Sequence, residues 1–455
     1  MTTSTPPTSP GESRQPDRAA VSVLDEVVAA QHAGVARGIT SVCSSHPLVL
    51  EAAIQQAVED GSPVLIEATS NQVDQHGGYT GMRPSDFRDL VLGLADRCGL
   101  PRERVLLGGD HLGTNRWRSQ PPAAAMAEAR DLVAAFVRAG FTKIHLDCSY
   151  PCAGDPVPLT DAIVSERAAD LLAVAEEAAA EVGLAGAVRY VVGTEVPVPG
   201  GADHPLDALV PTSAAAARAT VAAHRAAFAA RGLAAVWPQV MGLVVQPGVE
   251  FDAWRVVDYR SAATGELRAV LDEEPALVFE AHSTDHQTDT GLADLVRDHW
   301  AVLKVGPWLT FAMREALFAL SAIERELVPA AQQARLPEVV EQAMLDHPEH
   351  WRGHHGGTEA EQRLARRWSY SDRIRYYWPD PRVEAATAAM FTNLRRQPVP
   401  WPLLSAHLPV QHARVRAGLL DPDPTALVVD AVRDVLRRYA AATGTAQTPT
   451  TQETR

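Results

Sequence analysis

The stretch RVLLGGDH at residues 104–111 joins a short apolar run to a Gly-Gly turn, an aspartate and a histidine. An apolar run of this length, rich in Val, Ile or Leu, is typical of a strand buried in a parallel sheet. Seven similar runs occur along the chain, at Gly38–Cys43, Pro63–Ala68, Lys143–Asp147, Val188–Glu195, Val240–Gln246, Ala276–Ala281 and Ala301–Val305. Reactive groups directly after such strands are characteristic of a barrel whose chemistry lies at one rim.

Helical patterns separate these runs, among them Ala124–Ala139 and the alanine-rich Ser165–Val182 and Ser213–Ala230. Eight strands alternating with helices predict an α/β fold, a closed (β/α)8 TIM barrel. An open doubly wound sheet is the alternative, but it usually carries a G-x-G-x-x-G turn, which this sequence lacks. The sequence also lacks a G-x-x-x-x-G-K-[ST] loop, so we expect no nucleotide cofactor.

Composition divides the chain into four predicted parts. Residues 1–20 and 443–455 are rich in Pro, Ser or Thr, so we expect them to be disordered tails. Residues 21–330 contain the eight runs and are assigned to the barrel. Residues 331–442 contain helical patterns with few strand candidates. They are predicted to form an α-helical C-terminal extension that packs on the barrel.

The formal net charge of −15 argues against nucleic acid as a partner, because binding a phosphate backbone needs a basic surface. An acidic protein still binds an anionic sugar phosphate when positive groups gather locally. The N-terminus lacks the apolar core of a signal peptide, and no apolar run is long enough to span a bilayer. The four cysteines are too few for a disulfide framework. We therefore expect a cytoplasmic protein with no membrane partner.

Acidic and imidazole groups follow nearly every run, and in a barrel these strand ends share one rim. Spacing of two places Glu280 and His282 on one face of a strand, where such pairs ligate a metal or exchange protons. Two histidines are predicted to hold a divalent metal of the zinc or manganese class, namely His111 and His282. The predicted catalytic acids are Asp110, Asp147, Glu195 and Glu280.

Two of these assignments have structural alternatives. His145 shares a face with Asp147, but for His145 alone we favour a hydrogen bond to a carbonyl in the barrel wall. Asp110 and His111 are adjacent, so both reach a cavity only where the strand becomes a loop, which glycines permit. The alternative for that pair is a helix-capping aspartate with a surface histidine.

Phosphate binding is predicted from glycines and from positive charge. Gly306 follows the last run, where barrels often bind phosphate through backbone N–H groups. Lys304 either neutralises a phosphate or carboxylate or pairs with Glu280, and Gly77–Gly81 is either a phosphate loop or an ordinary one. Arginines in the aromatic segment 368–378 either pair with acids or reach a substrate phosphate. The predicted substrate-binding residues are Glu67, Asn71, Ser283, Thr284, Lys304, Gly306 and Arg373, with Arg375 beside the last.

Long stretches of the sequence are familiar, among them LLGGDHLGTNRW (106–117), AGFTKIHLDCSYPCAGDP (139–156), EAHSTDHQT (280–288) and SYSDRIRYYWP (369–379). Through these motifs the chain resembles the accessory, so-called non-catalytic, subunits of class II tagatose-1,6-bisphosphate aldolase, the GatZ/KbaZ family. The resemblance extends from about residue 25 to about residue 440.

This resemblance implies a barrel that forms an oligomer with a catalytic class II aldolase subunit and supports its activity and stability in hexitol or amino-sugar catabolism. Asp110 and His111 are similar to the Asp-His pair of catalytic class II aldolases, in which the histidine binds zinc. Relatives also resemble metal-dependent sugar-phosphate 4-epimerases, which act on tagatose 6-phosphate or fructose 6-phosphate. A pure scaffold needs no buried ionisable groups at its strand ends. An enzyme active on its own is therefore the alternative hypothesis.

Overall fold

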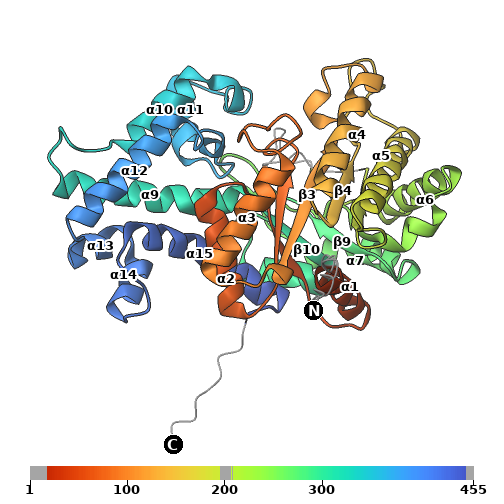
Figure 1. The fold of residues 1–455 in the computed structure, drawn as a ribbon, viewed down its shortest axis with the longest axis horizontal. Helices are drawn as coiled ribbons and strands as arrows, with labels where there is room; N and C mark the ends of the chain where they lie inside the picture. Colours follow the sequence, from red (N-terminus) through yellow and green to blue (C-terminus); the bar gives the residue numbers. More distant parts are fainter. Residues whose placement is uncertain (1–17, 195–205, 207–208, 447–455) are drawn as a thin grey trace, which may run out of the picture.

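The computed structural model describes residues 18–194, 206 and 209–446. Its centre is a closed barrel of parallel strands in the order β1-β10-β9-β6-β5-β4-β3-β2 (Figure 1). The barrel strands are β1 Ile39–Val42, β2 Val64–Thr69, β3 Val105–Gly113, β4 Lys143–Asp147, β5 Arg189–Val192, β6 Val240–Val244, β9 Val278–Ala281 and β10 Trp300–Val305. Each of the eight predicted runs contributes one of them, so the predicted barrel is confirmed and the open sheet is wrong.

Helices surround the strands, as the alternation of patterns predicts. They are α2 Pro47–Asp60, α3 Pro84–Cys98, α4 Pro122–Arg138, α5 Asp161–Glu181, α6 Ala214–Ala230, α7 Gly265–Arg268 and α8 Asp289–Arg297. A small antiparallel pair, β7 Glu250–Phe251 and β8 Val256–Val257, lies outside the barrel sheet. Within the described residues, none of the helices combines the length and apolarity that crossing a membrane requires.

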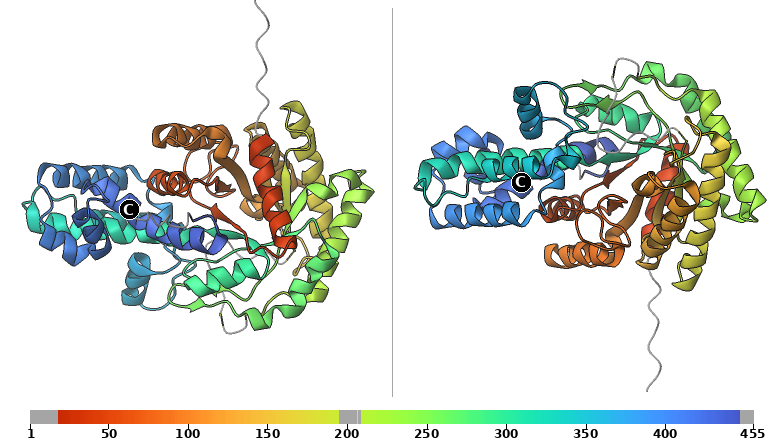
Figure 2. Two further views of the ribbon diagram at one scale, coloured as in Figure 1. Left: turned by 90° about the horizontal axis from the view of Figure 1, so that it is seen from below. Right: turned by 90° about the horizontal axis from the view of Figure 1, so that it is seen from above.

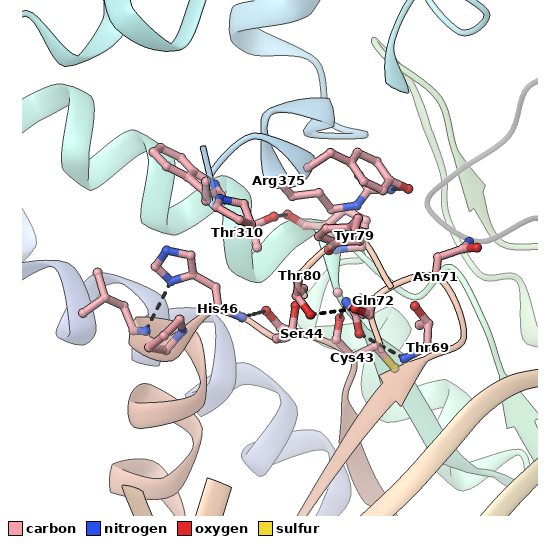
Figure 3. A pocket seen from close by; sticks show the side chains of 18 of the residues that line it. Cys43, Ser44, His46, Thr69, Asn71, Gln72, Tyr79, Thr80, Thr310 and Arg375 are labelled. Atoms are coloured by element: carbon pink, nitrogen blue, oxygen red, sulfur yellow. Dashed lines mark hydrogen bonds between the residues drawn. The ribbon is translucent and has the colours of Figure 1, made fainter. Parts of the chain in front are cut away.

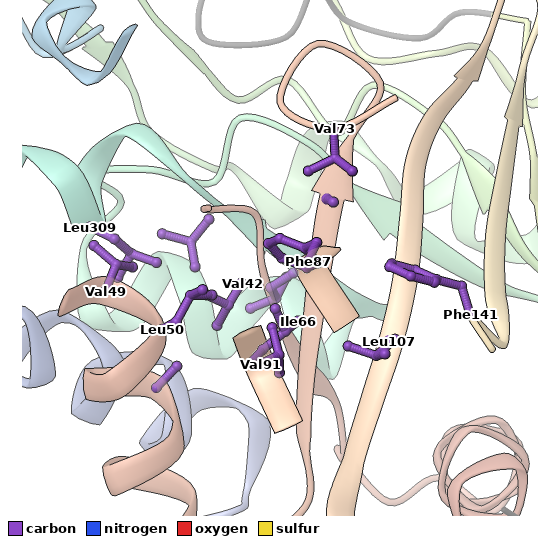
Figure 4. Close-up of a cluster of buried hydrophobic side chains, with 14 of the residues drawn as sticks. Val42, Val49, Leu50, Ile66, Val73, Phe87, Val91, Leu107, Phe141 and Leu309 are labelled. Carbon is purple, nitrogen blue, oxygen red and sulfur yellow. The ribbon is translucent and has the colours of Figure 1, made fainter. Parts of the chain in front are cut away.

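Apolar side chains fill both sides of the barrel wall. Outside it, Val42 and Ile66 of the strands pack with Leu50 of α2 and with Phe87 and Val91 of α3 (Figure 4). Each of these side chains is almost fully buried. Burying one such side chain contributes about 1.5–3 kcal/mol relative to exposure. The wall is therefore stable enough to hold polar groups at its rim.

Helix α1, Arg18–His32, closes the amino end of the barrel. Its side chains Leu24, Val27 and Val28 join one buried cluster with strand residues that include Leu65 and Met241. Figure 2 shows this helix lying across the barrel when the molecule is seen from below. Because this end is filled with apolar atoms, the opposite end is the one left for a polar site.

The last barrel helix departs from a simple ring. Helix α9, Pro307–Leu327, follows β10 but extends away from the barrel toward the C-terminal helices (Figure 1). Helix α15, Pro424–Thr443, packs along α9 and also against α2, α8 and β1. Between them lie α10 Leu336–Asp346, α11 Glu359–Trp368, α12 Pro381–Arg396, α13 Trp401–His407 and α14 Pro409–Arg416. The predicted helical extension is thus present, and its last helix completes the wall around the barrel.

Strand β3 is longer than predicted, and its two glycines lie within it instead of forming a turn. The run predicted to end at Gly108 continues to Gly113. A Cβ atom at Gly108 would lie 2.6 Å from Cγ of Glu67, and one at Gly109 would lie 2.6 Å from Cδ1 of Leu112. The glycines therefore make room for neighbouring side chains, and Asp110 and His111 belong to the strand, not to a loop after it.

Gly113 tests this packing most sharply. A Cβ atom there would lie 1.6 Å from the carbonyl oxygen of Asp147 in the neighbouring strand. We expect Gly113→Ala to lower the free energy of unfolding by about 3 kcal/mol, because the clash involves backbone that cannot rotate away. Denaturation in urea measures the change.

Gly93 in α3 provides the matched control, since an added Cβ atom there meets only Arg97 Nη1, at 3.6 Å. Gly93→Ala is expected to stabilise the protein by up to about 1 kcal/mol, because alanine favours the helix. Equal effects of the two substitutions would show that the β3–β4 contact is not as tight as described.

Candidate active site at the carboxyl end of the barrel

Four strands place ionisable side chains together at the carboxyl end of the barrel. Asp110 and His111 come from β3, His145 from β4 and Lys304 from β10, and His282 follows β9. Each of these residues is at most 4% exposed. The gathering of acidic and imidazole groups that the strand ends predict is therefore present in the fold.

Paired charges lie beneath this group, inside the barrel. Lys143 Nζ lies 2.7 Å from Glu67 Oε1 and 2.6 Å from Glu280 Oε2. Lys304 Nζ lies 2.9 Å from Glu280 Oε1 and also contacts Asp110. Buried charges are tolerated only when they are paired. In this structure Lys304 thus pairs with Glu280, one of its two predicted roles, and Glu67 is bound to Lys143.

The lysines and acids hold each other in the charged state. Burial raises the pKa of Glu280, but the positive charges of Lys143 and Lys304 outweigh it and leave the pKa well below its usual value. Burial lowers the pKa of Lys304, but Asp110 and Glu280 outweigh it and leave the pKa well above its usual value. The barrel interior therefore carries fixed charges at neutral pH.

Three histidines meet above these charges, each with one ring nitrogen close to a carboxylate. His111 Nδ1 lies 2.7 Å from Asp147 Oδ2, and His145 Nδ1 lies 3.1 Å from Asp110 Oδ1. His282 Nε2 lies 3.1 Å from Glu280 Oε1.

This arrangement differs from the prediction for His145: among the described residues its Nδ1 lies 3.1 Å from Asp110 Oδ1 and 3.3 Å from the backbone nitrogen of His111, and no carbonyl oxygen contacts it. A carboxylate behind each imidazole orients the ring and raises its basicity as a ligand.

The three imidazoles and Asp110 form a donor set that fits a divalent cation. Ligand atoms of Asp110, His111, His145 and His282 all lie within 4.8 Å of one another. His145 Nε2 is a buried atom that has no hydrogen-bond partner among the described residues. Imidazole nitrogens with one carboxylate suit zinc and related transition metals. The cluster contains both predicted metal ligands, His111 and His282, together with Asp110 and His145, which were not predicted as ligands.

The electrostatics favour neutral imidazoles at His145 and His282 and an ionised carboxylate at Asp110. Burial, followed by the charge of Lys304, lowers the pKa of His282 to about 3. Burial also lowers the pKa of His145. Burial raises the pKa of Asp110, but His111 and Lys304 outweigh it and hold that pKa well below its usual value. A metal ligand needs these protonation states.

Local backbone geometry lets the rim residues converge. His111 has φ of 51° and Ser283 has φ of 54°, both in the left-handed region that favours glycine. At His111 the pairing of β3 with β4 shifts register between Gly109 and Leu112. Such conformations cost about 1–3 kcal/mol each and concentrate at functional sites. This irregularity brings the adjacent residues Asp110 and His111 into one cluster, and neither is a helix cap or a surface residue.

Other predicted residues are placed differently. Gly306 donates its N–H to Asp285 Oδ1 at 3.0 Å, so its amide is already bound within the protein. Thr284 donates its hydroxyl to the carbonyl oxygen of Lys304 at 2.5 Å. Arg373 lies 2.8 Å from His354 Nδ1 and does not line the cavity described below. Glu195 lies outside the described residues.

A cavity of about 560 Å³ opens above the cluster. Asp110, His111, His282 and Lys304 line its barrel side, together with the predicted substrate-binding residues Asn71 and Ser283. The C-terminal extension lines it as well, through Arg375 and Tyr376. Figure 3 shows Thr69, at the end of β2, and Tyr79 and Thr80, in the loop after it, facing the same space as Arg375. The cavity is thus shared between the barrel and its extension.

Sequence reasoning missed Lys143 and Asp285 as parts of this site. Lys143 opens an apolar run, and its position inside a buried strand was the available signal, since a lysine there needs an acidic partner. Asp285 follows His282-Ser283-Thr284 in the sequence. Its carboxylate accepts the N–H groups of Gly306 and Trp308 at the start of α9, a contact that only the folded chain reveals.

Comparison with known proteins places this geometry in context. A family model described as D-tagatose-1,6-bisphosphate aldolase subunit GatZ/KbaZ-like matches residues 24–444. A crystal structure of a probable tagatose 6 phosphate kinase from Sinorhizobium meliloti 1021 has 48% sequence identity to this chain and a TM-score of 0.83. The match covers 89% of this chain and 100% of that chain.

A more distant likeness concerns the fold alone. The fructuronate-tagaturonate epimerase UxaE from Cohnella laeviribosi, solved with glycerol, is 11% identical and has a TM-score of 0.50. The match covers 90% of this chain and 81% of that chain.

Asp285 makes stability depend on pH in a direction opposite to that of most acids. It is 3% exposed, and burial raises its pKa from 3.8 to about 6 despite the two N–H bonds that it accepts. Between those values the native state holds a proton that the unfolded chain has lost, so stability falls as pH rises. Asp285→Asn keeps an acceptor oxygen and does not titrate. The difference between the unfolding free energies of the variant and the wild type should therefore rise, in favour of the variant, by up to about 3 kcal/mol between pH about 4 and pH about 7.

Urea denaturation of both proteins across this pH range measures the difference. Asp298→Asn is the matched control of opposite sign. Burial raises the pKa of Asp298, but its hydrogen bonds, first that with Ser261, outweigh it and leave the pKa below its usual value. That variant should lose stability relative to wild type as pH rises. If the difference for Asp285→Asn does not change with pH, the assignment of a raised pKa is wrong.

Proposed function

Because the chain belongs to the D-tagatose-1,6-bisphosphate aldolase subunit GatZ/KbaZ-like family, we propose that it acts in the cytoplasm as the accessory partner of a class II aldolase catalytic subunit. The single observation that carries this role is the family match over residues 24–444. The partner would cleave tagatose 1,6-bisphosphate, and the present chain would support its activity and stability in hexitol or amino-sugar catabolism. Assembly of the two chains into an oligomer is part of the proposal.

The cavity supports a sugar phosphate as the small-molecule ligand. Its volume of about 560 Å³ falls in the usual range for small-molecule sites. The relative from Sinorhizobium meliloti is described by the substrate tagatose 6 phosphate, which makes this compound the first ligand to test. Phosphoryl transfer is not part of the proposal, because the sequence lacks a phosphate-cradling nucleotide loop.

Mixing the chain with its catalytic partner tests the accessory role. We expect the isolated chain to be inert toward tagatose 1,6-bisphosphate and the mixture to exceed the activity of the partner alone. A partner present at about 100 times its Kd should also raise stability by about 2.7 kcal/mol, because it binds only folded chains. A coupled assay for glyceraldehyde 3-phosphate and thermal unfolding of the mixture give the two readouts. An unchanged rate together with an unchanged melting temperature would refute the role.

A second function is favoured by one specific observation, the four buried ligand atoms within 4.8 Å of one another. We propose as the alternative that the chain is itself a metal-dependent 4-epimerase or aldolase for hexulose phosphates. A divalent cation of the zinc or manganese class would supply Lewis-acid chemistry toward a carbonyl or hydroxyl oxygen of the sugar.

The chain's own residues would do the remaining work in this alternative. Asp110, His111, His145 and His282 would hold the cation, and Asp147 would orient the ring of His111 from 2.7 Å behind it. Glu280, ionised beside His282 and paired with Lys304, would orient the ring of His282 in the same way. Lys304 would offset negative charge that develops on the sugar.

Cation binding tests the proposed ligands independently of turnover. Titration calorimetry with Zn²⁺ or Mn²⁺ should detect one site in the wild-type chain. We expect His111→Ala to weaken binding by about 100-fold or more, and Asp147→Asn by roughly 10- to 100-fold, as orienting partners do. His347→Ala removes an imidazole whose side chain is 61% exposed, and it serves as the control with unchanged binding.

Assays with tagatose 6-phosphate and fructose 6-phosphate then separate the two functions. Turnover by the wild-type chain that is lost in His111→Ala supports the alternative, a metal-dependent epimerase or aldolase. Cation binding without turnover under any condition supports the accessory role. Failure of the wild-type chain to bind either cation would remove the alternative.

A further inference from the structure

Arg375 is a positive charge of the cavity wall that forms no ion pair with any carboxylate in the described part of the chain. It lies in the 3-10 helix η8, Arg373–Tyr376, within the C-terminal extension. Its Nη1 atom donates to the carbonyl oxygens of Ser371 and Asp372, and its Nη2 atom lies 3.1 Å from the hydroxyl of Tyr376. Among the described residues, no carboxylate oxygen forms an ion pair with it within 4.0 Å.

An arginine stays protonated in proteins, and Asp372 and Asp285 act on this charge only from beyond ion-pair distance, which leaves room for closer compensation. Arg314 in the same region shows the contrast, because it is paired with Asp372 at 2.8 Å. An anionic ligand in the cavity is therefore a natural counter-charge for Arg375.

Two tyrosines frame this guanidinium. Cζ of Arg375 lies 4.5 Å from the ring centroid of Tyr376, and the rings of Tyr376 and Tyr79 are 4.9 Å apart. Burial raises the pKa of Tyr376, but the charges of Arg375 and Arg373 outweigh it and leave the pKa below its usual value. Positive potential thus prevails at this wall. Figure 3 shows Arg375 and Tyr79 beside the same cavity.

The usual phosphate position of a barrel is already taken by a side chain. Barrels commonly bind phosphate at the loop after the last strands and at the start of the following helix. Here the carboxylate of Asp285 accepts the N–H of Gly306 at 3.0 Å and the N–H of Trp308 at 2.8 Å. A phosphate entering the cavity finds these donors engaged and an acidic group beside them. It must be bound elsewhere.

We infer that Arg375, with the hydroxyl groups of Tyr376 and Tyr79 nearby, binds the phosphoryl group of the sugar phosphate. The planar guanidinium matches two phosphate oxygens at once. The sugar would then reach from Arg375 across the cavity to His111 and His282, which line its barrel side. This inference rests on the proposed function for the identity of the sugar, but its phosphate site is tested without turnover. It makes the C-terminal extension a contributor to ligand binding.

Titration calorimetry of the full-length chain tests the site with three probes: inorganic phosphate, tagatose 6-phosphate and unphosphorylated tagatose. Arg375→Met should lower the affinity for inorganic phosphate and for tagatose 6-phosphate by roughly 10- to 100-fold, the range expected for the loss of charged hydrogen bonds. Binding of unphosphorylated tagatose should not change. Arg375→Lys keeps the charge but not the planar guanidinium that contacts two oxygens at once, so it should lower the affinity by an intermediate factor.

Arg352→Met is the matched control, because it removes an exposed positive charge from the same extension and leaves the net charge of the protein equal to that of Arg375→Met. Circular dichroism checks folding, and Arg375→Lys decides the outcome if the methionine variant is unfolded. The inference is overturned if Arg375→Met, or Arg375→Lys in its place, binds phosphate as tightly as Arg352→Met. It is equally overturned if Arg373→Met weakens phosphate binding and Arg375→Met does not, or if the wild-type chain binds no phosphate. If the wild-type chain binds phosphate through Arg375 but does not raise the activity of the aldolase partner, the proposed function fails and the phosphate site stands.

Discussion

Compensation of buried charge inside the barrel is the constraint on which the structure depends. Lys143 and Lys304 share the interior with Glu67, Glu280 and Asp110, and each lysine contacts two of these acids within hydrogen-bond distance. Removing one partner of a buried pair leaves an uncompensated charge and costs about 3–5 kcal/mol. The strands must therefore close in the one register that pairs these groups. The same register fixes the imidazoles above them, so pairing of the interior charges and orientation of the site come from one arrangement.

The path of the C-terminal helices explains why the cavity has two kinds of wall. Helix α9 leaves the ring after β10 and extends outward, and α15 returns to pack against α2, α8 and β1. The departure of α9 brings η8 and α12 to the mouth of the barrel, where both line the cavity. The cavity of this chain is thus built from the barrel and from its extension. The placement of the extension therefore determines the shape of the cavity.

Much of the architecture could be predicted because its signals are local. Each strand was marked by an apolar run, and each run became one strand of the barrel. The predicted partners Asp110, His111 and His282 also meet, since parallel strands bring their carboxyl ends to one rim. The role of His145 was not predictable, because its partner Asp110 lies 35 positions away and both come together only after β3 bends at His111. Lys143 was missed for a similar reason, since its acids belong to β2 and β9.

The sequence by itself determined the eight strands, the helices between them and the chemical types of the groups at the rim, because periodicity and side-chain chemistry act between near neighbours. Only the tertiary structure decided which of those groups pair, as Lys304 with Asp110, 194 positions apart, illustrates. It also decided that Asp285, not a ligand, holds the N–H of Gly306. The physical reason is competition: in a closed, water-poor interior every charge and amide takes its best available partner, and that choice depends on closure of the whole barrel.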